Sequence, residues 1–465
     1  MENVSEQPLN PNSDKGFEFG FAIGEITDTI AYQGFSFLIF TFYFNVMKLS
    51  ATLITWGFVF WSIFNALNDP LLGFLSDKTR TKKLGGGRRR PWILASLVPL
   101  AAIMILLFTP IGTEEISIFI YFFIIINLFD FIYTMYSLNR TSLFPEMFRD
   151  NFQRSRVGSY RRIIMIVGLI IAFVLPTILI PDIANVQDDP KTKVDYIITG
   201  AVFALLVLIT GFYFLKNGVR EPLEILEQAP EPFSLKKSFK VTIKNKPFMI
   251  FIIASTMNWY VFGLLPMIIS NYAVFVLEQE NSILISLLLL AVFLCSAPGV
   301  LIWKRVTDRF GARRAMMIST AFWICSFIPI FFFTDYWIAL IFWCISGIGL
   351  GGATYLIDLN ISNICDEDEL CTGRRREGSF FGMHALLIRL ATIMVVISIG
   401  AVLTTNGWEV YTPEKVTPEL LFGLRALVSL FPIAALSISL IFLKIYPLTD
   451  EKANENQRKL KTRNL

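Results

Sequence analysis

The chain has little of what soluble enzymes are built from. It contains one histidine, and 17% of its 465 residues are charged, against about 25% in an average soluble domain. It has no H-E-x-x-H or G-x-S-x-G motif, and none of its five cysteines has C-x-x-C spacing. These absences argue against metalloprotease, hydrolase and zinc-site chemistry. We therefore expect no enzymatic activity and no structural metal, and we interpret the cysteines as packing residues or incidental thiols.

Apolar residues make up 54% of the chain, which is typical of a membrane protein. Runs of about 20 apolar residues are long enough to cross a bilayer as helices. The predicted spans are 17–44, 50–76, 91–111, 117–147, 157–181, 195–216, 246–276, 282–303, 315–334, 336–364, 378–404 and 417–446. The sequence thus predicts an all-α membrane protein with twelve transmembrane helices.

A polar segment divides these spans into two groups of six. The stretch "KNGVREPLEILEQAPEPFSLKKSFKVTIKNKP" is too charged to cross a membrane, so we interpret it as a linker. The predicted organisation is an N-terminal tail 1–16, a six-helix bundle 17–216, a linker 217–245, a second bundle 246–446 and a tail 447–465.

Lysine and arginine gather in alternate loops. The loops at 78–90, 304–314 and 374–376 are basic, whereas "PIGTEEIS", "VLEQENS" and "FTDYW" contain no lysine or arginine. Because basic loops stay in the cytoplasm, both termini are predicted to be cytoplasmic. The first residues lack the pattern of a removable signal peptide. The net charge of +4 follows from these loops, so nucleic acid is not an expected partner.

The basic loops of the two halves echo each other. "GFLSDKTRTKKLGGGRRR" follows the second span and "WKRVTDRFGARR" follows the eighth, each with an aspartate ahead of its cations. Internal repetition is typical of transporters. We predict a cytoplasmic gate in which acids pair with these cations and release them when the halves move. Its candidate residues are Asp77, Arg88, Arg89, Asp308, Arg309, Arg375 and Glu377. The alternative is that the charges serve only as insertion signals and solvated loop ends.

The second span carries polar residues where a membrane helix has few. Asn65, Asn68 and Asp69 follow i, i+3, i+4 spacing, so they lie on one helix face. Asp69 precedes Asp77 by about 12 Å of helix, which puts it near the bilayer midplane. An ionised group there costs at least about 2.5 kcal/mol and suggests a function. The alternative is an aspartate that only pairs with a neighbouring helix.

Other spans supply partners for this aspartate. Acids, hydroxyls and arginines recur inside apolar helices, and buried charges need partners, which predicts a central polar site. The residues are Glu25 and Asp28 on the first span, Asp130, Thr134, Ser137 and Thr141 on the fourth, Arg161 on the fifth and Arg389 on the eleventh. His384 does not share a helix face with Arg389 and is interpreted as a structural histidine.

Several stretches carry a resemblance to a known family. "NALNDPLLGFLSDKTR", "CDEDELCTGRRREGSFFGMHALLIR", "IKNKPFMIFIIAS" and "RVGSYRRIIMIVG" are spread over both halves. They resemble motifs of the glycoside-pentoside-hexuronide:cation symporter family, the melibiose-permease-like branch of the major facilitator superfamily. The resemblance implies two six-helix bundles that work by alternating access.

The resemblance also implies roles for individual residues. Asn68, Asp69 and Thr134 match positions of the family's coupling-cation site. Arg161, Arg389 and Glu25 match or fall near positions that border the sugar, and Asp28 follows a turn later. Two departures stand out: Asn65 replaces an acid common on the second helix, and Ser137 replaces the acid that grips sugar hydroxyls in melibiose-type carriers.

We therefore expect a multi-pass plasma-membrane transporter that works as a monomer. It would move a sugar, glycoside or related small polar solute together with a proton or sodium ion, without another cofactor. Cation binding is assigned to Asp69, Asn65, Asn68 and Thr134, and substrate binding to Glu25, Asp28, Asp130, Ser137, Arg161 and Arg389. The alternatives are a carrier of lysolipids or other amphiphiles and, from another class, an intramembrane sensor or enzyme.

Overall fold

The architecture is entirely helical over the part of the chain that the structure describes. The structure, a computed structural model, describes residues 15–79, 87–148, 151–181, 183, 190–221, 242–372 and 376–463. The helices of the first half are α1 (Lys15–Thr41), which continues as the π-helix η1 (Phe42–Val46), α2 (Ala51–Lys78), α3 (Arg90–Leu106), α4 (Glu115–Met147), α5 (Asn151–Leu179) and α6 (Pro190–Asn217).

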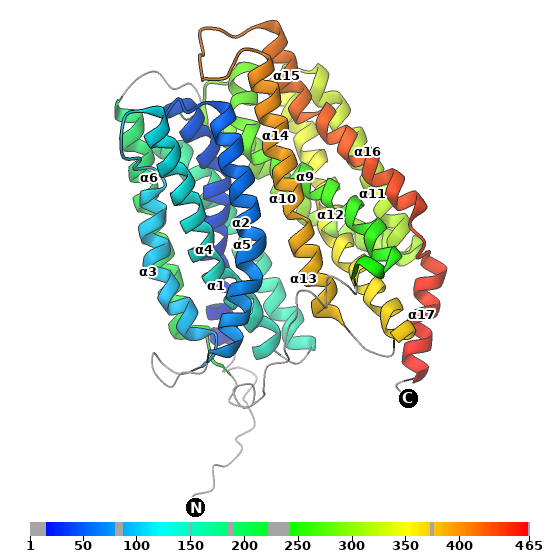
Figure 1. Ribbon diagram of the computed structural model, residues 1–465. Helices are drawn as coiled ribbons and strands as arrows, with labels where there is room; N and C mark the ends of the chain where they lie inside the picture. Colours follow the sequence, from blue (N-terminus) through cyan, green and yellow to red (C-terminus); the bar gives the residue numbers. More distant parts are fainter. Residues whose placement is uncertain are drawn as a thin grey trace, which may run out of the picture.

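The second half repeats this pattern with longer and broken rods. Its helices are α9 (Lys246–Phe275), α10 (Ser282–Phe310), α11 (Ala312–Phe332), α12 (Tyr336–Thr372), α13 (Glu377–Leu387), α14 (Arg389–Thr405), α15 (Pro418–Val428), α16 (Leu430–Ile445) and α17 (Asp450–Arg463). The pair α13 and α14 forms one interrupted rod, and so does the pair α15 and α16. Figure 1 shows the two halves side by side as separate bundles.

Most of these rods are suited to a bilayer. Nine helices in the described ranges are long and apolar enough to cross a membrane. Three more rods, α1, α2 and the 17-residue α3, belong to the first half, so each half contains six. The polar residues of α1 include Glu25 and Asp28. The predicted all-α membrane fold is confirmed.

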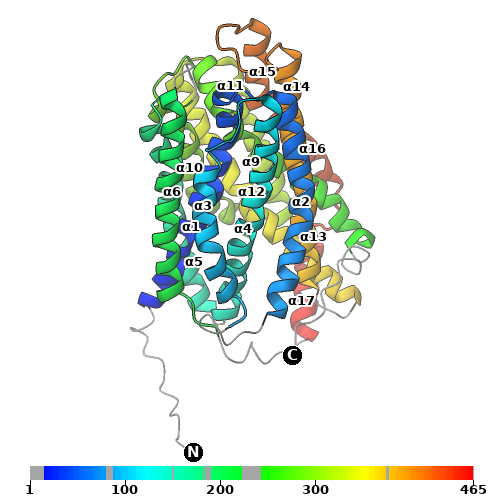
Figure 2. The same cartoon turned by 60° about the vertical axis from the view of Figure 1, so that its left-hand side comes forward.

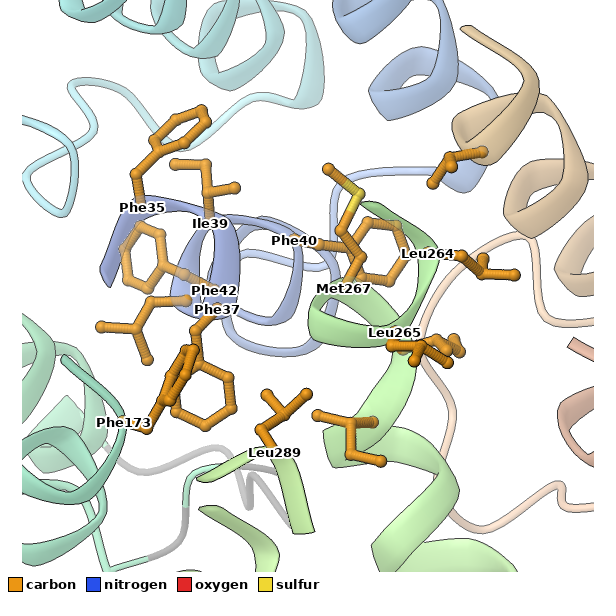
Figure 3. Packing of buried hydrophobic residues seen from close by; sticks show 14 of the residues in the cluster. Phe35, Phe37, Ile39, Phe40, Phe42, Phe173, Leu264, Leu265, Met267 and Leu289 are labelled. Atoms are coloured by element: carbon orange, nitrogen blue, oxygen red, sulfur yellow. The ribbon is translucent and has the colours of Figure 1, made fainter. Parts of the chain in front are cut away.

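The bundles meet along apolar helix faces. The contacts between them run from α1 to α9, from α2 to α14 and from α5 to α10. Figure 3 shows Phe40 of α1 beside Met267 of α9, with Phe173 and Leu289 from α5 and α10 on the same interface. These side chains are buried, so the interface is held chiefly by close packing.

The two faces of the molecule differ in how the bundles are joined. We call the face at which α1 begins and near which α17 lies the terminal face, and the opposite one, with α15, the distal face (Figures 1 and 2). On the distal side Ala51 donates its N–H to the carbonyl of Glu409 at 2.7 Å, and Asn45 Nδ2 donates to Asn271 Oδ1 at 2.9 Å. Each bond joins one bundle to the other, so the bundles are closed at the distal face.

A carboxylate stabilises the terminal end of the N-terminal bundle. Glu221, which follows α6, accepts N–H bonds from Arg88, Arg89 and Arg90 at 2.6–2.8 Å, at the start of α3. The preceding Gly87 has φ +110°, and a Cβ there would overlap this carboxylate. Glu221 thus caps α3 and fixes the end of α6 to it.

The C-terminal bundle contains the same device. Asp450, which follows α16, accepts the N–H groups of Arg313 and Arg314 at 2.8 and 3.3 Å, at the start of α11. Gly311 precedes them with φ +88°, and a Cβ there would overlap the Asp450 carboxyl group. The two halves therefore share a tertiary contact as well as a sequence pattern.

Candidate functional site

A cavity of about 700 Å³ lies between the two bundles. Its lining comes from α1, α2 and α4 on one side and from α9, α13 and α14 on the other. It extends from Ser36 and Asp69 toward Ser142 and Phe381, which lie nearer the terminal face. The volume lies within the usual range of small-molecule sites, about 300–1,000 Å³.

Aromatic rings form much of the cavity wall. Tyr32 and Tyr133 are stacked with ring centroids 5.4 Å apart, and Trp61 lies on the same bundle. Trp259 and Phe262 of α9 face the cavity from the other bundle, 5.1 Å apart at their centroids. Rings with polar edges can contact the apolar face of a ligand and still hydrogen-bond its rim.

An ion pair crosses the cavity from one bundle to the other. Arg389 Nη2 lies 2.7 Å from Asp69 Oδ2, and Thr134 donates its hydroxyl to Asp69 Oδ1 at 3.2 Å. The side chains of Asp69 and Arg389 are each 26% exposed, so the pair faces the cavity. Three residues predicted from three different helices are thus brought together.

The break in the eleventh rod fixes this arginine. α13 ends at Leu387 and α14 begins at Arg389, whose carbonyl accepts a hydrogen bond from Ser62 Oγ at 2.9 Å. Both the main chain and the side chain of Arg389 are therefore bonded to α2. These two contacts with α2 hold the guanidinium of Arg389 at the cavity wall.

Two predicted site residues of α2, Asn65 and Asn68, do not line the cavity. Asn65 and Asn68 are only 2% and 3% exposed and are absent from the cavity lining. Asn68 Nδ2 donates to Asp130 Oδ2 at 3.1 Å, and Asp130 is itself 3% exposed. Asp130 was predicted to bind substrate, but the structure puts it against the predicted cation-site residue Asn68.

Glu25 and Asp28 of α1 belong to a separate buried cluster. Arg140 of α4 lies 2.7 Å from Glu25 and 3.1 Å from Asp28, and Arg161 of α5 lies 2.7 Å from Glu25. The two positive and two negative charges of this cluster balance. Ser137 and Thr141, which lie on α4 with Arg140, face the cavity instead. Glu25, Asp28 and Arg161 do not line the cavity.

Sequence reasoning missed Arg140. An arginine inside the apolar fourth span was a signal of its own, because an isolated buried charge is costly. His384 also lies outside the cavity lining, where it shares a hydrogen bond of 2.7 Å with Ser255 of α9.

The predicted gate residues that the structure describes make contacts within single bundles. Arg88 and Arg89 lie 2.7 and 3.2 Å from Glu146 of α4. Asp308 and Arg309 line a second polar cavity of about 480 Å³ at the terminal end of α10. Arg375 and the side chains of Asp77 and Glu377 lie outside the described residues.

The sequence also matches those of known proteins. The sequence profile of the family described as MFS/sugar transport protein matches residues 20–450. The glucuronide carrier protein homolog of Escherichia coli is 23% identical, with 94% of this chain and 93% of that protein covered. The mouse sodium-dependent lysophosphatidylcholine symporter 1 is 22% identical, with 85% and 78% covered.

A solved structure has the same fold. A bacterial homologue of the human lysosomal transporter Spinster, in an inward-facing conformation, superposes with a TM-score of 0.67 at 12% identity. The match covers 96% of this chain and 99% of that one.

Proposed function

The chain belongs to the MFS/sugar transport protein family, and on that premise we propose that it is a cation-coupled symporter of a sugar, glycoside or related small polar solute. The observation that carries the proposal is the ion pair between Asp69 and Arg389, which links the two bundles at the wall of a ligand-sized cavity. The protein resides in the plasma membrane and works as a monomer.

The terminal face is the cytoplasmic face in this proposal. The basic stretches 87–90 and 304–314 adjoin it, and basic loops stay in the cytoplasm. The distal bonds of Ala51 and Asn45 then close the outer entrance, and the cavity extends toward the cytoplasm. The structure would correspond to an inward-facing state.

The ion pair supports coupling because each of its members has a second possible partner: a substrate oxygen for Arg389 and the coupling cation for Asp69. A substrate oxygen that binds Arg389 competes with Asp69, and the pair must rearrange whenever the bundles separate at this level. Substrate and cation each favour the rearranged state, so each raises the affinity for the other. Such reciprocal coupling is typically worth about 1–3 kcal/mol.

A sugar is favoured by the chemistry of the wall. The cavity combines the rings of Tyr32, Tyr133 and Trp259 with the hydroxyls of Thr134 and Ser137, which suits a flat ring with hydroxyls at its edge. The relative named as a glucuronide carrier homolog supports the same class.

A lysolipid or other amphiphile is the second candidate. A side cavity of about 190 Å³ shares Trp259 and Phe262 with the main one. Leu350, Ala353 and Ile357 form the apolar part of its wall, and Arg162 and Asp358 also line it. The apolar part of this wall suits an acyl chain. The relative named as a lysophosphatidylcholine symporter favours the same cargo.

Counterflow in proteoliposomes tests the proposal, because exchange needs no gradient. We expect labelled sugars or glycosides to exchange saturably, and a proton or sodium gradient, imposed separately, to drive accumulation. Ala385→Phe, which fills the cavity wall, should abolish exchange, whereas Ala401→Phe on the exposed side of α14 should not. Exchange of lysolipids alone would establish the second candidate, and exchange of neither class would contradict the proposal.

A further inference from the structure

Two opposite charges face the side cavity from different bundles. Arg162 of α5 and Asp358 of α12 both line its wall, and both side chains are exposed. Both also lie within helices that are apolar enough to cross a membrane, where an ionised group is costly and suggests a function. Neither was among the predicted site residues.

These two charges do not satisfy each other. Asp358 lies near enough to Arg162 for the guanidinium to act on it electrostatically. In the part of the chain that the structure describes, however, neither side chain has an ion-pair or hydrogen-bond partner. A cation and an anion are therefore both available to a group that enters the space between them.

The α9 wall of the side cavity suits an ammonium group. Asn258 donates Nδ2 to the carbonyl of Ala254 at 2.8 Å and to Ser439 Oγ at 2.9 Å, which leaves Oδ1 as an acceptor. Within the described residues this Oδ1 accepts no hydrogen bond, and the Asn258 side chain is 2% exposed. Trp259 also lines the cavity, and the face of a tryptophan ring attracts ammonium groups.

We propose that the side cavity binds a zwitterionic group, with its ammonium toward Asp358 and its anionic oxygens toward Arg162. A group of one charge would face a like charge on the opposite wall, whereas a zwitterion satisfies both walls. The guanidinium fork suits a carboxylate, phosphate or sulfonate.

The size of the side cavity indicates that it takes one group of a larger ligand or a small solute. Its volume of about 190 Å³ is below the usual range for whole-ligand sites, about 300–1,000 Å³. Trp259 and Phe262 line both cavities, so the remainder of a larger ligand can extend past them into the main cavity.

This inference rests on the proposed transport function and adds a recognition site to it. The zwitterion can be a small solute or the headgroup of a lysolipid, because both present the same two charges. Since Arg162 and Asp358 belong to different bundles, the bound group also bridges the bundles.

Thermal stability of the full-length protein tests the site, because a bound ligand raises the apparent Tm in proportion to ln(1 + [L]/Kd). The protein is held at constant ionic strength in nanodiscs of phosphatidylglycerol, which has no zwitterionic headgroup. Glycine betaine and glycerophosphocholine are the soluble probes, and lysophosphatidylcholine is the lipid probe. We expect at least one of these zwitterions to stabilise the wild type. Choline, glycerol phosphate and lysophosphatidylglycerol each carry one charge and should bind about tenfold more weakly or less.

Single neutralisations should change the charge preference of the site. Arg162→Gln and Asp358→Asn should each weaken zwitterion binding about tenfold or more. Arg162→Gln should then favour choline, and Asp358→Asn should favour glycerol phosphate, an exchange that an ion pair acting only as a gate would not produce. The matched controls Arg305→Gln and Glu414→Gln remove exposed charges that do not line the cavity and should leave the response to every probe unchanged.

The wild-type comparison keeps the test decisive if a variant fails to fold. The proposal is overturned if no zwitterion stabilises the wild type, if choline or glycerol phosphate stabilises it equally well, or if either folded variant binds zwitterions like the wild type. A response to all three zwitterions would assign recognition to the headgroup alone, and a response to lysophosphatidylcholine alone would assign the site to lipid; both outcomes support it.

Transport separates this inference from the function on which it rests. Exchange of sugars without any zwitterion response in stability would retain the transporter and reject the site. Zwitterion binding that depends on Arg162 and Asp358, without exchange of any sugar, zwitterion or lysolipid, would retain the site and reject the proposed function.

Discussion

Replacing Arg140 by glutamine should be among the most destabilising single changes in the N-terminal bundle. The Arg140 side chain is 2% exposed and bridges Glu25 at 2.7 Å and Asp28 at 3.1 Å. Its loss leaves Asp28 without an ion-pair partner in the described structure. Removing one member of a buried pair costs about 3–5 kcal/mol, because the other charge stays buried and uncompensated.

Arg161 provides the matched comparison. It contacts the same Glu25 at 2.7 Å but is 21% exposed, and its removal leaves both acids bonded to Arg140. We expect Arg161→Gln to cost less, about 1.5–3 kcal/mol. Asp28→Asn should recover part of the Arg140→Gln loss, with a coupling energy of about 0.5–3 kcal/mol. Denaturant titration of the purified variants measures all three, and equal losses for the two arginine variants would refute the reasoning.

Three further predictions concern the cavity, the caps and the topology. Arg389→Ala should reduce exchange and ligand-induced stabilisation at least tenfold, and Arg389→Lys should recover part of both; unchanged uptake by the alanine variant would remove Arg389 from the site. Gly311→Ala should lower the apparent Tm more than Gly407→Ala, because both glycines have positive φ but only Gly311 faces a carboxyl group; equal shifts would discount the Asp450 cap. A single cysteine at Asn454 in a cysteine-free protein should react with impermeant reagents only after cells are opened, and labelling of intact cells would reverse the topology.

Much of the fold could be predicted from length and hydropathy alone. Runs of about 20 apolar residues recur with basic loops between them, and a bilayer leaves such runs few alternatives to helices. The break at Ile388 was not predicted, since no proline or glycine lies beside it. The break at Ser429 had a signal in Pro432, which cannot donate an N–H to the carbonyl of Val428 and clashes with it.

The site was predicted only in part, because spacing along one helix gives the face and depth of a residue but not the residue that meets it from another helix. Asp130 and Thr134 lie on one stripe of α4, yet they are about 6 Å apart along the axis. Thr134 consequently reaches Asp69 at the cavity, while Asp130 meets Asn68 away from it. The partners of Arg140 and Arg88 depend on which helices pack together, and that is a tertiary property.

The caps of α3 and α11 impose an order on biosynthesis. Glu221 leaves the ribosome before any residue of α9. The first bundle can therefore form the cap on α3 while the helices of the second bundle are still being inserted. Asp450 emerges only after α16, so the cap on α11 cannot form until every span has been made. A chain that stops just before Asp450 would contain all its membrane helices and still lack the cap at the start of α11. Chaperones and proteases act on chains that are less stable, so the fate of a truncated product would depend on a residue outside the membrane.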